Sequence, residues 1–284
     1  MNGQPAADSD EPASEPASNS VTVSVAEPVS AGDGKPVYPR AVAVQGDQLW
    51  VVDLDLPGIW SQKNGSNTLF TPGTKLLRKP MNRPWCVTAH PGGGILIGDS
   101  ATREIYHAAD QGTNLTALGS GYIGIPMAIT VSPDSKQIYV GDAERRAIFR
   151  LPIGGGNPEL VVRVNARGLS FDGQGLLWAV TPDAEAVCRI DTSKKTAEPI
   201  VTGRPYQFPN GIVWVGDHGY VTDGYGKSIW KFTADGKTEK WFTGQPLTGP
   251  VGITADDEHL YVCDPRTQQV YQFDRATKVI EKRF

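Results

Sequence analysis

The stretch Leu49-Trp50-Val51-Val52-Asp53, an apolar run that ends in an acid, decides the fold because it recurs along the chain. Related runs occupy residues 95–99 (ILIGD), 138–142 (IYVGD), 177–181 (LWAVT), 219–223 (GYVTD) and 260–264 (LYVCD). Their last residues lie 46, 43, 39, 42 and 41 positions apart, and the fourth copy ends in Thr181 instead of an aspartate. A period near forty residues is typical of propeller blades built from four short strands. Six copies therefore predict an all-β fold, a six-bladed β-propeller of four-stranded antiparallel blades.

A second landmark precedes each of these runs and keeps the same phase. It consists of a proline, a variable residue, a small residue and a branched or apolar residue. Its copies begin at Pro39, Pro84, Pro126, Ala166, Pro209 and Pro250. Proline is tolerated where a strand starts, and a small residue suits strands whose backbones approach closely. Because helical periodicity is absent at useful length, the two landmarks support strands throughout.

The chain divides at about residue 38 into a leader and the repeat region. Residues 1–37 predict a flexible acidic leader, because their Pro, Ala, Ser and acidic residues cannot bury enough apolar surface to become ordered. Within it, residues 21–25 alternate like a strand and are expected to add to an outer sheet edge. Residues 38–284 predict the propeller, whose last repeat contains all four of its own strands. The leader resembles a spacer that follows a removed export signal, so we expect an exported protein (periplasmic, cell-surface or extracellular).

Charge and cysteine content exclude several classes of function. The net charge of −4 argues against nucleic acid or an anionic membrane as a partner. No apolar stretch is long enough to predict a transmembrane segment. Cys86, Cys188 and Cys263 follow no metal-binding or redox spacing, so we expect them to be structural and unpaired.

The aspartates that end five of the runs have two interpretations. Five acids at one end of a ring suggest a metal site, but each is followed by a turn whose backbone N–H groups a carboxylate can accept. The same residue in nearly every repeat favours a turn cap over a unique site. We therefore expect these aspartates to be structural.

The pattern of a Pro-x-Gly-Ile start, a Leu-Tyr-Val-x-Asp run and an Ile-Tyr/Phe third strand resembles the NHL-repeat family. It is also similar to the wider superfamily of gluconolactonase-like (senescence-marker-protein) and strictosidine-synthase-like propellers. The resemblance covers about residues 38–284 and indicates the fold more strongly than the activity, since one scaffold hosts many functions. It implies that the variable residue after each proline lies nearest the central axis, on the face where ligands bind. These residues are Arg40, Trp85, Met127, Arg167, Asn210 and Val251.

The first five of these residues form the predicted ligand-binding site. Arg40 and Arg167 belong to repeats one and four, which face each other across a six-fold ring, and paired guanidiniums suit a carboxylate or a phosphate. Trp85 would supply an apolar wall, as would Tyr38, Tyr122 and Phe208 on adjoining loops. The alternative that both arginines pair with nearby terminal aspartates remains open.

The sequence leaves three classes of function open, two of them as the main hypotheses. The leading hypothesis is a non-catalytic module without a cofactor that binds a partner protein or a small anionic ligand at the axial mouth or blade-top loops. The alternative, implied by the resemblance, is a gluconolactonase-like lactonase or hydrolase in which Asn210 helps to bind a divalent cation such as calcium. Arg167 and Val251 stand where that family needs further Asn and Asp ligands, which favours the non-enzymatic hypothesis. A structural assembly protein that uses its blade edges is the third.

Overall fold

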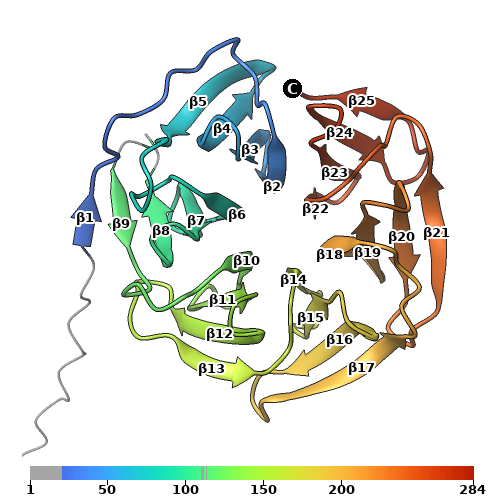
Figure 1. The fold of residues 1–284 in the computed structure, drawn as a ribbon. Coiled ribbons are helices and arrows are strands. Elements are labelled where there is room, and N and C mark those ends of the chain that lie inside the picture. Colours follow the sequence, from blue (N-terminus) through green and yellow to red (C-terminus); the bar gives the residue numbers. More distant parts are fainter. Residues whose placement is uncertain (1–20, 110–111, 113) are drawn as a thin grey trace, which may run out of the picture.

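The structure, a computed structural model, describes residues 21–284 apart from 110–111 and 113. The described residues form six sheets arranged around a central axis, and none of them is helical (Figure 1). The predicted all-β, six-bladed propeller is therefore confirmed. It follows that the described part of the chain offers no long apolar helix of the kind that crosses a bilayer.

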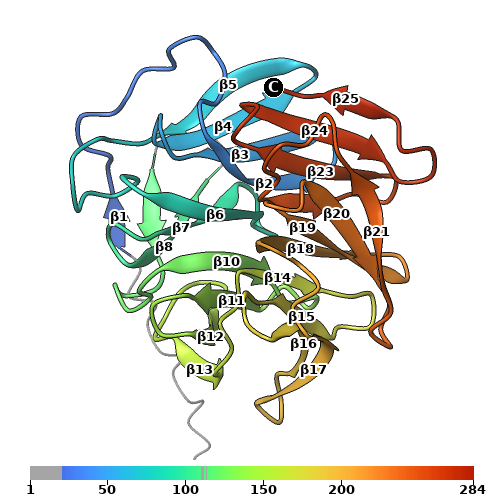
Figure 2. The same ribbon diagram turned by 45° about the vertical axis from the view of Figure 1, so that its right-hand side comes forward.

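In each blade the strands follow chain order from the axis outward (Figures 1 and 2). Blades 1 and 2 consist of β2 (Pro39–Gln45), β3 (Gln48–Asp53), β4 (Gly58–Lys63), β5 (Ser66–Pro72), β6 (Pro84–Ala89), β7 (Ile95–Asp99), β8 (Glu104–Ala108) and β9 (Leu115–Ala117). Blades 3 and 4 consist of β10 (Pro126–Val131), β11 (Gln137–Asp142), β12 (Ala147–Pro152), β13 (Glu159–Val162), β14 (Gly168–Phe171), β15 (Leu177–Val180), β16 (Glu185–Asp191) and β17 (Thr196–Thr202). Blades 5 and 6 consist of β18 (Pro209–Val215), β19 (His218–Asp223), β20 (Ser228–Phe232), β21 (Thr238–Thr243), β22 (Ile253–Ala255), β23 (His259–Asp264), β24 (Gln269–Asp274) and β25 (Ile280–Lys282).

The apolar core lies between the blades. Six clusters fill the six spaces, each made of side chains from two neighbouring sheets. Trp178 of blade 4, for example, stacks on Trp214 of blade 5 with ring centroids 4.6 Å apart. The second strand of each blade is covered on both faces, which explains why its sequence is a continuous apolar run instead of an alternating one.

The ring closes by side-chain packing between blades 6 and 1, because each blade contains its own four strands. Val42 and Trp60 of blade 1 share a buried cluster with Tyr261 and Val270 of blade 6. The C-terminal segment reinforces this contact, since Arg283 Nε donates to Gln62 Oε1 at 2.9 Å.

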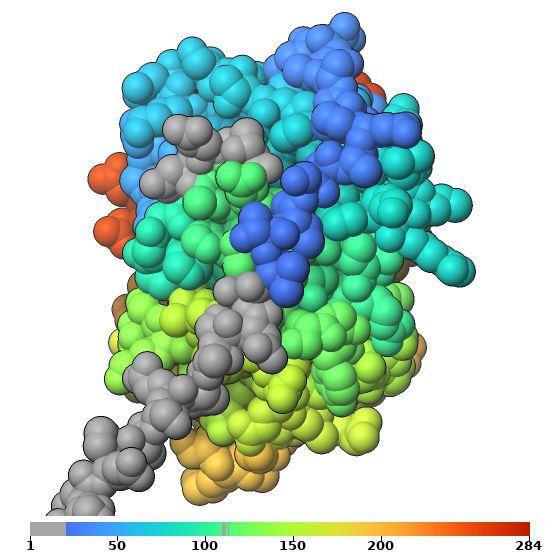
Figure 3. All heavy atoms as spheres, turned by 90° about the vertical axis from the view of Figure 1, so that its left-hand side faces the viewer, coloured from blue at the N-terminus to red at the C-terminus, as the bar shows by residue number. Residues whose placement is uncertain are grey.

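The chain before the propeller runs along the outside of the ring. Strand β1 (Val21–Val23) pairs antiparallel with β9 and adds a fifth strand to the outer edge of blade 2. From there the segment crosses to blade 1, where the Val29 N–H donates to the Gly73 carbonyl at 2.8 Å. Figure 3 shows this blue segment on the outer surface. Most of the predicted flexible leader, residues 1–20, lies outside the described residues.

Candidate functional site

The predicted binding residues lie where the first strand of each blade begins. We call this end of the ring the mouth face; it also carries the loops after each terminal aspartate. In blades 1, 2, 3 and 5 the pairing of the first two strands is interrupted at or next to the variable residue. A β-bulge of this kind redirects a side chain out of the regular alternation. The bulges therefore explain how Arg40, Met127 and Asn210 come to face the axis; in blade 4 the strand pairing is regular and Arg167 lies just before it.

Four of the five predicted residues line one small axial cavity. These are Arg40, Met127, Arg167 and Asn210, and the fifth, Trp85, lies beside Arg40 with its ring centroid 5.4 Å from the Arg40 guanidinium carbon. The cavity volume is about 70 Å³, whereas one water molecule takes up roughly 30 Å³ of liquid. The enclosed space therefore suits a carboxylate-sized group, and a larger ligand would extend out of it onto the mouth face.

A second ring of side chains lines the cavity together with the first. It takes one branched apolar residue from each blade, all of them buried. They are Val42, Val87, Ile129, Leu169, Ile212 and Ile253. The axial cavity is thus polar where the arginines lie and apolar around the rest of its wall, which suits a group whose charged end meets the arginines.

Arg40 is a buried charge without a counter-charge. Its residue surface is 6% exposed, and among the described residues its guanidinium contacts the Trp85 ring and no carboxylate acts on it. Burial lowers the pKa of Arg40, and the neighbouring positive charge of Arg167 lowers it further. A buried cation is costly unless it is paired, so the contact with the Trp85 ring compensates it only in part.

Arg167 and Asn210 also keep polar atoms free. Burial lowers the pKa of Arg167, and its Nε is buried without a hydrogen-bond partner among the described residues. The Asn210 Nδ2 donates to the Phe208 carbonyl at 3.2 Å, while no described group donates to its Oδ1. Two guanidiniums and one amide therefore converge on the axis with unused hydrogen-bonding capacity.

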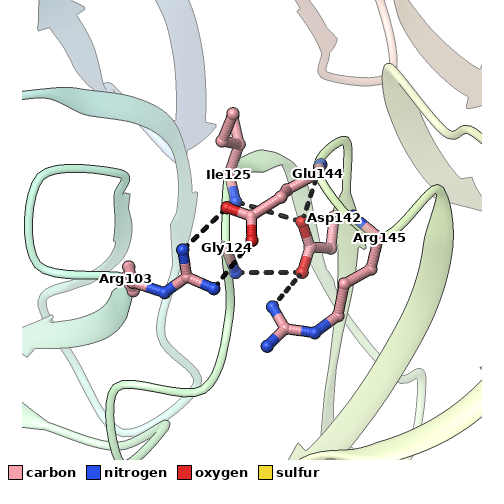
Figure 4. Close-up of polar contacts among 6 residues, drawn as sticks. All are labelled: Arg103, Gly124, Ile125, Asp142, Glu144 and Arg145. Atoms are coloured by element: carbon pink, nitrogen blue, oxygen red, sulfur yellow. Dashed lines mark hydrogen bonds and ion pairs between the residues drawn. The ribbon is translucent and has the colours of Figure 1, made fainter.

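The terminal aspartates do not pair with these arginines, which answers the question that the sequence left open. Each of the five is buried and caps the backbone, as predicted. In blade 3 the Asp142 carboxylate accepts the N–H groups of Gly124 at 2.9 Å and Ile125 at 3.0 Å from the loop before the blade (Figure 4). It also accepts the Glu144 N–H of the following turn at 3.0 Å. These aspartates hold the mouth-face loops and leave Arg40 and Arg167 unpaired.

A second, larger pocket adjoins the axial mouth at blades 1 and 2. Its volume is about 330 Å³, and Tyr38, Leu77, Arg83 and Trp85 are among the residues that line it. Leu77 is 79% exposed. Because Trp85 lines this pocket and also contacts Arg40, which lines the axial cavity, the pocket borders the axial mouth.

The other aromatic residues predicted at the mouth lie on separate loops. Tyr122 is covered by the Arg145 guanidinium, 4.4 Å from its ring centroid. Phe208 stacks on Tyr225 at 4.6 Å, and Tyr225 is 58% exposed. Sequence reasoning missed Tyr225, although its place in the loop after Asp223 is a signal that could have identified it.

Basic residues predominate in the loops of the mouth face. Those without an ion pair among the described residues are Lys75, Arg78, Lys79, Arg83, Arg163, Arg204, Lys227 and Arg266. Two of the acids on this face are already paired, Glu144 with Arg103 at 2.7 Å and Asp183 with Arg146 at 2.8 Å. A chain with a net charge of −4 therefore carries a positive surface around its axis.

The residues around the axis do not fit a divalent metal ion. A hard cation such as calcium takes roughly six to eight oxygen ligands, and the cavity offers the Asn210 amide between two guanidiniums. Within the described part of the chain, no cluster of three or more His, Cys, Asp or Glu side chains is arranged to hold a metal. Cys86, Cys188 and Cys263 are buried and unpaired, as predicted, and burial raises the pKa of Cys86 to about 12.

Comparison with known proteins places the chain in a fold and not in a family. No protein-family model matches it, and no curated protein matches its sequence. Virginiamycin B lyase from Staphylococcus aureus is similar in structure, with 15% identity and a TM-score of 0.66 over 93% of this chain and 87% of that chain. A chain of a nidogen/laminin complex gives 19% identity and a TM-score of 0.67 over 76% and 84%. A gluconolactonase from Xanthomonas campestris gives 15% identity and a TM-score of 0.65 over 88% and 96%. At these identities the likeness shows the six-bladed fold alone, a fold that lyases, lactonases and a protein of a binding complex share.

Proposed function

We propose that this protein is a non-catalytic binding module whose axial mouth receives an acidic group of a partner protein. The observation that carries the proposal is the pair of axial arginines, Arg40 and Arg167. Among the described residues no carboxylate acts on Arg40, and the one acid near Arg167, Asp183, forms its ion pair with Arg146 instead. An acidic side chain of a partner would supply the missing counter-charge. Arginine suits this role because its planar fork binds a carboxylate through two parallel hydrogen bonds.

The axial cavity holds only the acidic group, so most of the contact with any partner lies outside it. A cavity of about 70 Å³ encloses one carboxylate, whereas pockets for small organic ligands span roughly 300–1,000 Å³. The rest of the partner would have to lie on the mouth face, over Trp85, Tyr38 and the exposed Leu77. Aromatic residues and arginine are the side chains that dominate binding energy at protein interfaces.

The resemblance to lactonases supplies a weaker candidate. A hydrolase of that type would need several oxygen ligands for its cation, and the axis presents two arginines instead. The similarity to a chain of a nidogen/laminin complex supports the binding hypothesis only as far as the shared fold goes. The proposal therefore depends on the arginines and the shape of the mouth.

The test uses a fluorescein-labelled hexaglutamate peptide as a minimal acidic partner and measures its anisotropy with the purified protein. Replacing both axial arginines (Arg40→Ala with Arg167→Ala) should weaken binding at least about tenfold, because a hydrogen bond to a charged group contributes roughly 1.5–3 kcal/mol. The matched control, Lys194→Ala with Lys195→Ala, removes two positive charges from exposed positions at the opposite end of the ring. It should change the affinity less than about twofold, since exposed charges contribute little.

Equal losses in the two double variants would show that only overall charge matters and would overturn the proposal. Arg40 is buried, so the double variant is first compared with the wild type by circular dichroism and thermal unfolding. If it does not fold, the single variant Arg167→Ala replaces it, because Arg167 is only partly buried. An unchanged affinity in that variant would equally count against the axial site.

A further inference from the structure

Blade 4 lacks the cap that every other blade has. In the others, the terminal aspartate accepts N–H groups from the loop just before the first strand. Asp223 accepts those of Gln207 at 3.0 Å and Phe208 at 2.8 Å. Asp264 does the same for the corresponding residues of blade 6, at 2.7 and 2.9 Å. In blade 4 the corresponding position is Thr181.

Thr181 cannot replace the missing carboxylate on the loop side. Its hydroxyl donates to the Glu185 carbonyl at 2.7 Å and accepts the Asp183 N–H at 3.0 Å, so it serves only the turn that follows. The loop residues that correspond to Gln207 and Phe208 of blade 5 are Val164 and Asn165. No described group accepts a hydrogen bond from the backbone N–H of either residue.

Asn165 provides a second, independent sign of an incomplete site. Its surface is 7% exposed, and its Oδ1 is buried without a hydrogen-bond partner among the described residues. An unpaired buried polar group costs roughly 1–3 kcal/mol. Rotation of the amide about its last torsion exchanges oxygen for nitrogen, so the Asn165 side chain can offer either an acceptor or a donor at this point.

These groups line a cavity of about 480 Å³ between blades 3 and 4. Arg163 is exposed at the cavity and has no ion pair among the described residues, whereas Arg146 is paired with Asp183 at 2.8 Å. Arg145, also at the cavity, is paired with the Asp142 cap of blade 3 at 3.1 Å. Glu185 is the other acid that lines the space, and it is exposed.

We propose that this cavity binds a small organic carboxylate whose carboxylate group takes the place of the aspartate missing from blade 4. The backbone N–H groups of Val164 and Asn165 donate to it as their counterparts donate to Asp223, and the Asn165 amide and the Arg163 guanidinium add further donors. The cavity volume of about 480 Å³ leaves room for the rest of such a ligand, since small-molecule pockets span roughly 300–1,000 Å³. This site is separate from the axial mouth, so neither proposal depends on the other.

Acetate is the direct probe, because it is the aspartate side chain without its backbone. Sodium acetate is titrated against sodium chloride at equal ionic strength and pH, and the amide protons of Val164 and Asn165 are followed by ¹H–¹⁵N correlation spectroscopy. We expect saturable downfield shifts at these two amides. Flat titrations in the wild type would overturn the proposal.

Substitutions at Thr181 supply the matched pair. Thr181→Asp provides the carboxylate covalently and should abolish the acetate response, while Thr181→Ser keeps the hydroxyl and the cavity and should retain it. An acetate response of equal size in Thr181→Asp would place acetate elsewhere and refute the site. If Thr181→Asp does not fold, Arg163→Ala, at the exposed rim of the cavity, tests the site instead. It should weaken acetate binding up to about fivefold. An unchanged affinity would contradict the proposed set of hydrogen-bond donors. The double variant Arg40→Ala with Arg167→Ala should keep the response, which separates this site from the axial mouth.

Discussion

Truncation of one aspartate cap, Asp142→Ala, should destabilise the propeller far more than the loss of a surface ion pair. The carboxylate accepts the Gly124 and Ile125 N–H groups at 2.9 and 3.0 Å and the Glu144 N–H at 3.0 Å. The Gly124 contact is buried, whereas the Ile125 and Glu144 contacts are partly buried. A buried amide left without an acceptor costs roughly 1–3 kcal/mol, and the partly buried Ile125 amide adds about 1 kcal/mol because water can reach it. The loop-side pair therefore predicts a loss of about 2–4 kcal/mol. That is a large share of the roughly 5–15 kcal/mol by which a typical domain is stable.

Equilibrium unfolding in guanidinium chloride, followed by tryptophan fluorescence and far-ultraviolet circular dichroism, measures this loss. Glu144→Ala is the matched control, because Glu144 lies two residues away and pairs with Arg103 at 2.7 Å, where both side chains are more than 40% exposed. An exposed pair contributes at most about 1 kcal/mol. If Asp142→Ala lost no more stability than Glu144→Ala, the capping role would be wrong.

Two further predictions use the same unfolding assay. Burial raises the pKa of Asp142, but the backbone amides and the Arg145 guanidinium outweigh it, and the net pKa lies below its usual range. The stability that the charged Asp142 gives over Asp142→Asn should therefore be complete above the ordinary carboxyl pKa of about 3.9 and should shrink as the pH falls from there toward the lower folded-state pKa. Melting temperatures from pH 7 to 3 measure the onset of this loss, and a difference that stays constant down to pH 3 would contradict the reasoning. Arg283→Ala removes the bond to Gln62 that joins blades 6 and 1 and should lower the free energy of unfolding by about 1–2 kcal/mol. The control Lys282→Ala, at an exposed neighbouring position, should leave that free energy almost unchanged. Equal losses in the two variants would show that the Arg283–Gln62 bond does not help to close the ring.

The repeating features of the fold could be predicted from the sequence because they are local and occur in every blade. The run that ends at Asp53 is buried on both faces, so its continuous apolar pattern indicated an inner strand directly. The proline before each variable residue marked the strand start, and Pro39 does begin β2. What the sequence could not provide is the bulge at Arg40, because a bulge depends on the register between two strands and not on either strand alone.

The contacts of the caps illustrate the same limit. The turn after Asp142 could be predicted, since an aspartate commonly binds the amides two or three residues later. Its bonds to Gly124 and Ile125 could not, because only the pairing of β10 with β11 brings that loop beside the carboxylate. The same holds for Arg40 and Arg167: their place near the axis was predicted, but the small volume of the cavity between them was not.

The sequence shows Thr181 where the other five repeats have an aspartate. The effect of this difference on stability can be judged from the energy that an aspartate cap contributes. The aspartate cap of blade 3 stabilises the folded state by about 2–4 kcal/mol, by the reasoning for Asp142. Blade 4 lacks a stabilising contribution of that size when its loop amides stay unpaired. A ligand that binds only the folded state stabilises it by about 2.7 kcal/mol when its concentration is 100 times its Kd. At that concentration a carboxylate bound beside Thr181 would restore about as much stability as the missing aspartate takes away. Thr181→Asp without acetate and the wild type at saturating acetate should therefore unfold at similar temperatures. If acetate leaves the melting temperature of the wild type unchanged while Thr181→Asp melts several degrees higher, the cavity accepts a carboxylate that is attached to the chain but does not bind a free one.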